Sequence, residues 1–254
     1  MTDTGSTVTA CVVIIGNEIL SGRTQDQNIA FIGKRCDELG IHLRECRVIP
    51  DIEQTIIATV DECRNEFTYV FTTGGIGPTH DDITTAAVAS LFNLQIERNA
   101  AAVEAMMKYY GPARLSDARM KMADIPVGAV LVDNPVSGAP GFQIENVFVL
   151  PGVPMIMQAM FEGITGRLIG GAPVLTANVV TGLTEGALAD GLGVIQKDYP
   201  EITIGSYPFF RMGKLGVNIV LRSVDSLLLA TATEAVKALV GSLDGDILET
   251  GEYP

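Results

Sequence analysis

The chain has 254 residues, of which 47% are apolar, so it can build one large domain or a medium domain with a smaller second one. It carries 30 acidic and 17 basic residues, and this excess of acid argues against a nucleic-acid partner, whose phosphates need a basic surface. The sequence contains no uncharged apolar run of about 18 residues, so no membrane partner is expected.

The amino-terminal segment from Met1 to Ala10 is polar and contains no Lys or Arg. A secretory signal begins with a basic region, so we expect this segment to be a short frayed tail. The four cysteines lack the paired spacing of a structural zinc site and lie in apolar segments, which predicts buried free thiols. Together these features favour a cytoplasmic location.

Strand-like and helix-like segments alternate through the first half of the chain. Strands are expected at residues 11–16, 42–49 and 69–73, with an irregular stretch at 17–26. Helices are expected at 29–39, 52–63, 82–91, 101–110 and 114–123, followed by a hairpin over 142–150 and a helix over 154–168. This order predicts an α/β fold in three layers, with a mostly parallel sheet and helices on both faces.

The composition changes at residues 170–173, which we interpret as a linker between a domain at 8–170 and a second at 174–254. Beyond the linker, strands are expected at 177–183, 201–207 and 216–223, and helices at 185–199 and 226–243. This order predicts a small C-terminal α+β domain with a mixed or antiparallel sheet.

A glycine-rich loop directly follows the third strand, at the sheet edge where ligands of such folds bind. Glycine adopts positive φ and places no side chain over a ligand, so successive N–H groups here can converge on a phosphate. The predicted ligand-binding residues are Thr73, Gly74, Gly75, Ile76, Gly77, Pro78 and Thr79. The alternative is a tight strand-to-helix turn that binds nothing.

Acidic residues accompany this loop. Asp81 and Asp82 would repel a phosphate unless a cation such as Mg²⁺ lay between them, so both are candidate ligands of a divalent metal. Asp82 is also a candidate catalytic residue, as is Asp51, which follows the second strand toward the same edge. For both, the alternative is an N-cap at the start of a helix. His80 has no evident partner and is given no acid–base role.

Three further loops contain candidate ligand-binding residues. After the first strand, Glu18 could bind the metal, and Ser21 and Arg23 could reach a phosphate; the alternative is an ordinary polar loop. Asn28 opens the next helix and is a candidate for contact with the ligand; the alternative is that it simply faces solvent. The other two loops are rich in glycine and proline and could be simple turns. The candidates in these three loops are Gly16, Asn17, Glu18, Ser21, Gly22, Asn28, Ser137, Gly138, Pro151 and Gly152.

The runs at residues 16–22, 72–84 and 150–154, in this order, resemble the molybdopterin-binding domain family of MoaB and MogA. More closely, they resemble the N-terminal region of the competence/damage-inducible protein A (CinA) family. The resemblance covers about residues 8–170, and residues 204–208 resemble the small second domain of CinA proteins. It implies a nucleotide or pterin ligand on the glycine loop, functional aspartates at Asp51 and Asp82, and a homo-oligomer.

The resemblance leaves three functions open. The first is metal-dependent hydrolysis of ADP-ribose-type pyrophosphates. The second is molybdopterin binding or adenylylation in molybdenum cofactor biosynthesis, with molybdopterin as a bound group. The third is a non-catalytic nucleotide-binding module, which Ile156 favours because CinA relatives commonly carry glutamate there. The deamidase domain of many CinA proteins is not expected, since the sequence ends at Pro254.

Overall fold

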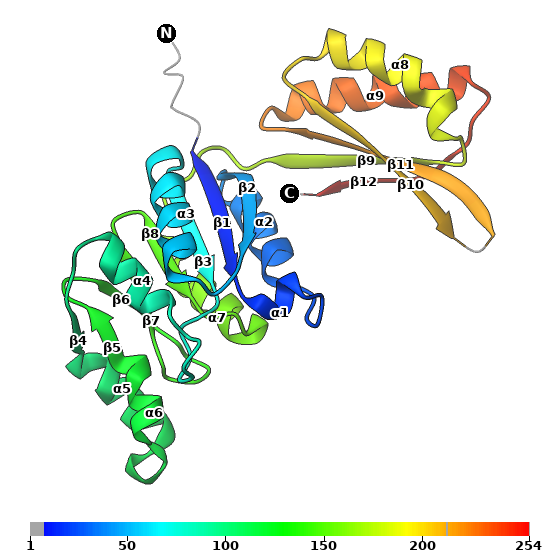
Figure 1. Cartoon of the computed structure of the whole chain (residues 1–254). Helices are drawn as coiled ribbons and strands as arrows, with labels where there is room; N and C mark the ends of the chain where they lie inside the picture. Colours follow the sequence, from blue (N-terminus) through cyan, green and yellow to red (C-terminus); the bar gives the residue numbers. More distant parts are fainter. Residues whose placement is uncertain (1–7, 212, 254) are drawn as a thin grey trace, which may run out of the picture. The chain divides into compact units, whose positions relative to one another are not determined.

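The structure, a computed structural model, describes residues 8–211 and 213–253. The chain forms two compact units that divide between Gly171 and Ala172 (Figure 1). The expected tail lies outside the described residues as far as residue 7, whereas Thr9 and Ala10 already belong to the first strand. Within the described part, no helix combines the length and apolarity needed to cross a bilayer.

The first unit is built on a six-stranded sheet. Its strands are β1 (Thr9–Ile15), β2 (His42–Ile49), β3 (Tyr69–Thr73), β6 (Val130–Val132), β7 (Gly141–Ile144) and β8 (Val147–Leu150). Their order is β2-β1-β3-β8-β7-β6. The first four run parallel, while β7 and β6 are each antiparallel to their neighbours. The predicted mostly parallel sheet is confirmed.

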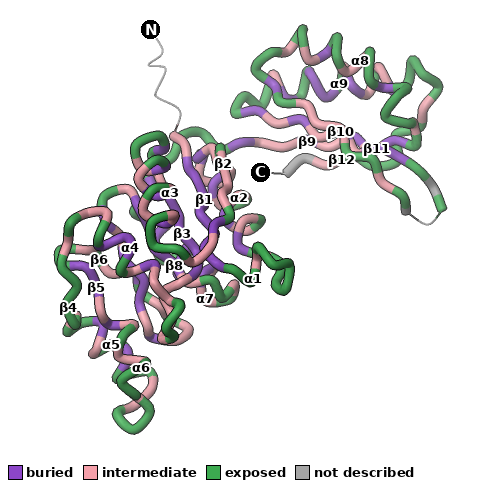
Figure 2. The backbone as a smooth tube through the Cα atoms, viewed as in Figure 1, coloured by how far each residue is buried: buried purple, intermediate pink, exposed green. Residues whose placement is uncertain are grey.

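Helices cover both faces of this sheet, as predicted. Along β1, Cys11, Val13 and Ile15 face one core, whereas Ala10 and Val12 face the other, because successive strand residues point to opposite faces. The first core includes residues of α3 (Glu53–Glu66), α4 (Thr84–Leu91) and α5 (Ala100–Tyr110); the second includes residues of α2 (Asn28–Glu38) and α7 (Pro154–Ile164). Figure 2 shows the buried positions concentrated on the central strands.

Two expectations for local structure in this unit were wrong. The stretch after β1 contains a short helix, α1 (Asn17–Leu20). The helix expected at 114–123 is broken into a 3₁₀ turn at Pro112–Arg114, α6 (Asp117–Met120) and a second 3₁₀ turn at Lys121–Ala123. The break occurs because the Ser116 hydroxyl accepts a hydrogen bond from the Arg119 N–H and so starts a new helix. Two short strands, β4 (Ile96–Arg98) and β5 (Asp124–Pro126), were also missed.

The four cysteines are free, and Cys11, Cys36 and Cys63 are buried whereas Cys46 is half-buried. The sulfurs of Cys11 and Cys63 lie 3.5 Å apart, between β1 and α3. Their hydrogen bond and their burial raise the pKa of Cys11, so this thiol stays protonated.

The second unit is an α+β fold with an antiparallel sheet, as predicted. Its elements are β9 (Leu175–Thr181), α8 (Glu185–Asp198), β10 (Thr203–Arg211), β11 (Lys214–Ser223), α9 (Ser226–Ser242) and β12 (Ile247–Tyr253). The strand order is β10-β11-β9-β12, and both helices pack on the same core (Figure 1). The last strand, β12, was not predicted, and it pairs with β9 at the edge of the sheet.

Candidate functional site

The sheet topology brings the predicted site loops to one edge of the first unit. Strands β1, β2, β3 and β8 are parallel, so the loops after them leave from the same edge. Because β7 is antiparallel to β8 and β6 is antiparallel to β7, β6 runs in the same direction as β8, and the loop after it, residues 133–140, also lies at that edge. This edge lies toward the bottom of the first unit in Figure 1, where α1 is labelled.

The glycine loop could not be built with larger residues. Gly74 has φ 105°, and a Cβ there would lie 2.1 Å from the main-chain oxygen of Ile15. Gly75 has φ 66°, and its Cβ would lie 2.1 Å from the Thr84 hydroxyl. The Gly74 N–H donates to the Leu150 oxygen at 3.1 Å, so this amide is not available to a ligand. The loop is therefore fixed against β1, β8 and the start of α4.

The next three residues of the loop offer main-chain donors. The N–H groups of Gly75, Ile76 and Gly77 have no hydrogen-bond partner among the described residues, and all three residues are half-buried. Polar main-chain groups in such positions are normally paired. Three consecutive unpaired donors beside a helix N-terminus are an arrangement that suits an anion.

Asp81 and Asp82 both lie against Thr79. The Thr79 hydroxyl oxygen is 2.5 Å from a carboxylate oxygen of each, and Asp82 also accepts from the Thr79 N–H at 2.7 Å. A hydroxyl has one hydrogen, so it can donate to only one of the two carboxylates at a time. Its hydrogen bond holds the pKa of Asp81 below the usual range, and the side chain of His80 is 98% exposed.

The N-cap alternatives for the two candidate catalytic aspartates are wrong. Helix α4 begins after Ile83 and has no side-chain cap, because Asp82 bonds back to Thr79 instead. Helix α3 begins after Ile52, also without one. Asp51 instead accepts a hydrogen bond of 2.9 Å from the Asn17 N–H, the first residue of α1.

The loop after β1 brings Glu18 close to Gly16. A Cβ on Gly16 would lie 2.5 Å from Oε1 of Glu18, and the Gly16 N–H donates to the Ile49 oxygen at 3.1 Å. Glu18 and Asp51 therefore flank the same turn. Further along this loop, Arg23 Nε donates to the Ser21 hydroxyl at 3.0 Å, and Ser21 and Gly22 are exposed.

Asn28 is only 2% exposed, so its expected solvent-facing alternative was wrong. Its Nδ2 donates to the Gly152 oxygen at 2.9 Å, and its Oδ1 is buried without a partner in the described structure. Gly152 in turn packs on Gly74: a Cβ on Gly152 would lie 3.4 Å from the Gly74 Cα. Asn28 thus links the start of α2, the Pro151–Gly152 turn and the glycine loop.

Ser137 and Gly138 are organised by Asn134, a residue that we did not single out. Asn134 accepts from the Ser137 N–H at 2.9 Å and donates to the Ser137 hydroxyl at 2.7 Å. Asparagine before proline is a turn signal that could have identified it. Gly138 (φ 74°) lies against α5, where its Cβ would be 2.7 Å from the Cβ of Tyr109. The contacts of this loop are therefore with α5.

The candidate metal ligands do not form one cluster. Asp81 and Asp82 meet at Thr79, whereas Glu18 lies over Gly16. Within residues 8–211 and 213–253, no group of three or more His, Cys, Asp or Glu side chains could hold a metal ion. Ile156, where CinA relatives commonly carry glutamate, packs against the core beneath α2 and α7.

Two protein families match the sequence. The one described as "Probable molybdopterin binding domain" matches residues 11–170, and "FAD synthase, middle domain" matches residues 173–248. A protein of Aeropyrum pernix is 34% identical, over 94% of this chain and 96% of its own length. A protein of Archaeoglobus fulgidus is 34% identical, over 78% of this chain and 84% of its own.

Among solved structures, the protein CinA with unknown function from Thermoplasma acidophilum is similar to the first unit. It is 34% identical with a TM-score of 0.60, and the match covers 64% of this chain and 99% of that one. The tungsten cofactor synthesizing protein MoaB from Pyrococcus furiosus is 20% identical with a TM-score of 0.42, over 64% and 92% of the two chains.

Proposed function

Because the chain belongs to the molybdopterin-binding domain family, as its motifs predicted, we propose that the first unit binds a phosphate-bearing pterin of the molybdopterin type. The observation that carries this proposal is the row of unpaired N–H groups at Gly75, Ile76 and Gly77. Hydrogen bonds from fixed main-chain donors recognise a phosphate without the basic surface that this chain lacks.

The surrounding contacts support a preformed anion site. Gly74 cannot move without disturbing its contact with β1, and its hydrogen bond to Leu150 ties the loop to β8. Asn28 holds Gly152 beside Gly74 and so fixes the Pro151–Gly152 turn as a second side of the site. A site that is already ordered loses little conformational entropy on binding, so few donors are enough for useful affinity.

Hydrolysis of an ADP-ribose-type pyrophosphate is the second candidate. The observation in its favour is the convergence of Asp81 and Asp82 on the single hydroxyl of Thr79. A Mg²⁺ ion commonly takes one or two carboxylates and completes its shell with water and ligand phosphates, and these two side chains fit that role. When bound, such an ion offsets phosphate charge and lowers the pKa of its water.

In either function, the chain's own residues have defined tasks. The amides of residues 75–77 donate to phosphate oxygens, and Thr79 keeps Asp82 turned toward the loop. Asp51 holds the start of α1 through the Asn17 N–H, and so keeps Glu18 at the site edge. A cytoplasmic location and a homo-oligomer complete the proposal.

Calorimetry and turnover assays on the full chain separate the candidates. We expect molybdopterin to bind with a dissociation constant in the micromolar range, and ADP-ribose to release no AMP with or without Mg²⁺. Asp82→Asn should change pterin affinity less than tenfold if the amides dominate. Glu104→Gln, an exposed acid on α5, is the matched control.

Three results would redirect the proposal. AMP release from ADP-ribose that needs Mg²⁺ and is lost in Asp82→Asn would favour the hydrolase. Transfer of AMP from ATP to bound molybdopterin would make the protein an adenylyltransferase. Nucleotide binding without turnover, and without pterin binding, would favour the regulatory module.

A further inference from the structure

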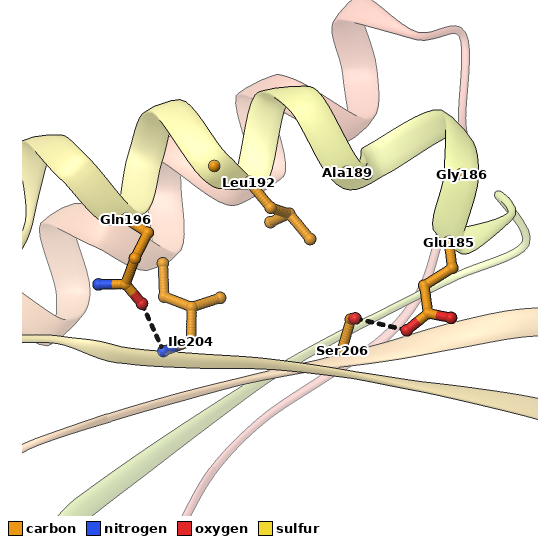
Figure 3. Close-up of a pocket in the computed structure, with 8 residues that line it drawn as sticks. Glu185, Gly186, Ala189, Leu192, Gln196, Ile204 and Ser206 are labelled. Atoms are coloured by element: carbon orange, nitrogen blue, oxygen red, sulfur yellow. Dashed lines mark hydrogen bonds between the residues drawn. The ribbon is translucent and has the colours of Figure 1, made fainter.

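The second unit contains a hollow of about 510 Å³ between α8 and β10 (Figure 3). Its ends are polar and its middle is apolar. Glu185 and Ser206 lie at one end and Gln196 at the other, while Leu192 from α8 and Ile204 from β10 line the space between them. A hollow of this volume is in the range of small-molecule sites.

Two glycines of α8 line this hollow without a packing reason. Glycine weakens a helix, so a helical glycine calls for an explanation. Gly191 has one, because its Cβ would lie 2.3 Å from the Leu239 side chain on α9. A Cβ on Gly186 or Gly193 would meet no described atom within 4 Å. The effect of these two glycines is to leave one wall of the hollow bare.

The polar side chains at the Glu185 end can accept hydrogen bonds but have no further hydrogen to donate. The Ser206 hydroxyl donates to Glu185 Oε1 at 2.6 Å (Figure 3), so its remaining lone pairs and the carboxylate are all acceptors. Among the described residues, Glu185 is the only charged one that lines the hollow, and it is exposed. This end therefore suits a cation that carries N–H donors.

The Gln196 side chain has no N–H left to donate to a ligand, and its oxygen already has one partner. Its Nε2 donates to the oxygens of Tyr199 and Ile202, at 3.2 and 2.7 Å. Its Oε1 accepts from the Ile204 N–H at 3.1 Å. This end closes the hollow, and the ligand's polar group belongs at the other end.

An added peptide strand does not fit this position, although β10 is the edge strand of its sheet. Main-chain groups two residues apart face the same side of a strand, so those of Ile204, Ser206 and Pro208 all face away from β11. Gln196 already occupies the Ile204 N–H, and Pro208 has none. Beside the hollow this leaves one N–H, that of Ser206, which is too few for strand addition.

We propose that this hollow binds a small organic cation, with a primary ammonium group against the Glu185 carboxylate and the Ser206 hydroxyl oxygen and a short apolar body along Leu192 and Ile204. The three N–H donors of an ammonium match the carboxylate and the hydroxyl oxygen. The bare surface at Gly186 and Gly193 leaves room for the apolar body, and Glu185 repels anions.

Benzylamine is a suitable probe, with benzoate as its anionic counterpart. In amide NMR spectra of the full chain, millimolar benzylamine should shift the signals of Gly186, Gly193 and Ser206, while benzoate should shift none of them. Glu185→Gln should weaken benzylamine binding at least tenfold. Glu201→Gln, an exposed acid outside the hollow, should leave it unchanged. Equal affinity in Glu185→Gln, or equal shifts with benzoate, would overturn the proposal.

A second variant distinguishes an effect on ligand binding from an effect on the stability of the fold. Gly193→Ala adds a methyl group to the wall of the hollow and removes a helical glycine, so it should raise Tm by about 3 °C. At the same time it should weaken benzylamine binding at least fivefold. A raised Tm with unchanged affinity would show that the apolar body does not lie along α8, and would contradict the proposed placement.

Discussion

The glycines of the 74–77 loop and two glycines of helix α8, Gly186 and Gly193, have opposite relations to their surroundings. At Gly74 and Gly75, the backbone has positive φ and an added Cβ would collide with neighbouring atoms at 2.1 Å. At Gly186 and Gly193, the backbone is helical and an added Cβ would meet nothing within 4 Å. At the first two positions the fold requires glycine, whereas at Gly186 and Gly193 it merely tolerates glycine at some cost in helix stability.

This difference shows how a structure can reveal why a position is occupied by glycine. A glycine that the fold requires gives no separate evidence of a ligand, because its absence would break the loop in any case. A glycine that the fold does not require can instead serve a ligand. Substitution by alanine should therefore lower the free energy of unfolding at Gly74 and raise it at Gly186 and Gly193.

The largest effect is expected for Gly74→Ala. Positive φ and the collision with the Ile15 oxygen together should lower the free energy of unfolding by about 3 kcal/mol. Urea denaturation followed by circular dichroism measures this. Gly22→Ala is the matched control, since Gly22 has φ 70° and open space around it, and should lose only about 1 kcal/mol. Equal losses would mean that the close approach to β1 is unimportant.

A smaller loss is expected for Asn28→Ala. The Gly152 oxygen loses its donor near the glycine loop, which should cost about 2 kcal/mol of unfolding free energy. The same denaturation experiment measures it, with Asn65→Ala on the exposed surface of α3 as control. A change in the free energy of unfolding below about 0.5 kcal/mol would show that the Pro151–Gly152 turn keeps its position without Asn28.

Gly186→Ala should act in the other direction. With no steric conflict and a helical backbone, alanine should stabilise α8 by about 1 kcal/mol. Differential scanning calorimetry would register this as a higher Tm. If the variant is instead destabilised, Gly186 is required by the fold after all, and the contrast with the 74–77 loop disappears.

The smallest effect concerns the pKa of Asp81. The Thr79 hydroxyl lowers this pKa, so the stabilisation is present above the unfolded-state pKa and is lost as pH falls through the lower, folded value. Thr79→Val should raise the pKa of Asp81 toward its usual value, as measured by carboxyl NMR titration. The pKa of Glu62, which Arg47 lowers, should stay the same and serves as the internal control.

The fold was largely accessible from sequence because its signals are local. Strands β2 and β3 were predicted with their observed ends, since Pro50 and Gly74 punctuate apolar segments. β12 was missed because residues 247–253 have few apolar side chains, and their pairing with β9 involves residues about 70 positions away. The sequence pattern carries no information on such a partner.

The site was accessible only as a set of loops. The sheet topology explains why these loops share an edge, and parallel strands could be inferred from the alternation of strand-like and helix-like segments in the sequence. The hydrogen-bond partners could not be inferred: Asp51 bonds to Asn17 rather than to its own helix, and Asn28 bonds to Gly152, 124 residues later. Capping rules describe neighbours in sequence, and both contacts are between distant segments.

The connection between β6 and β7 can vary without disturbing the rest of the first sheet. The strand β7 is antiparallel to both β6 and β8, so the connection at residues 133–140 joins two antiparallel strands, β6 and β7, at the edge of the sheet. Insertions or deletions there leave the pairing of the four parallel strands untouched, along with the amides of residues 75–77. A change in the length of this connection would therefore alter the surface at this edge of the sheet without disturbing the 74–77 loop.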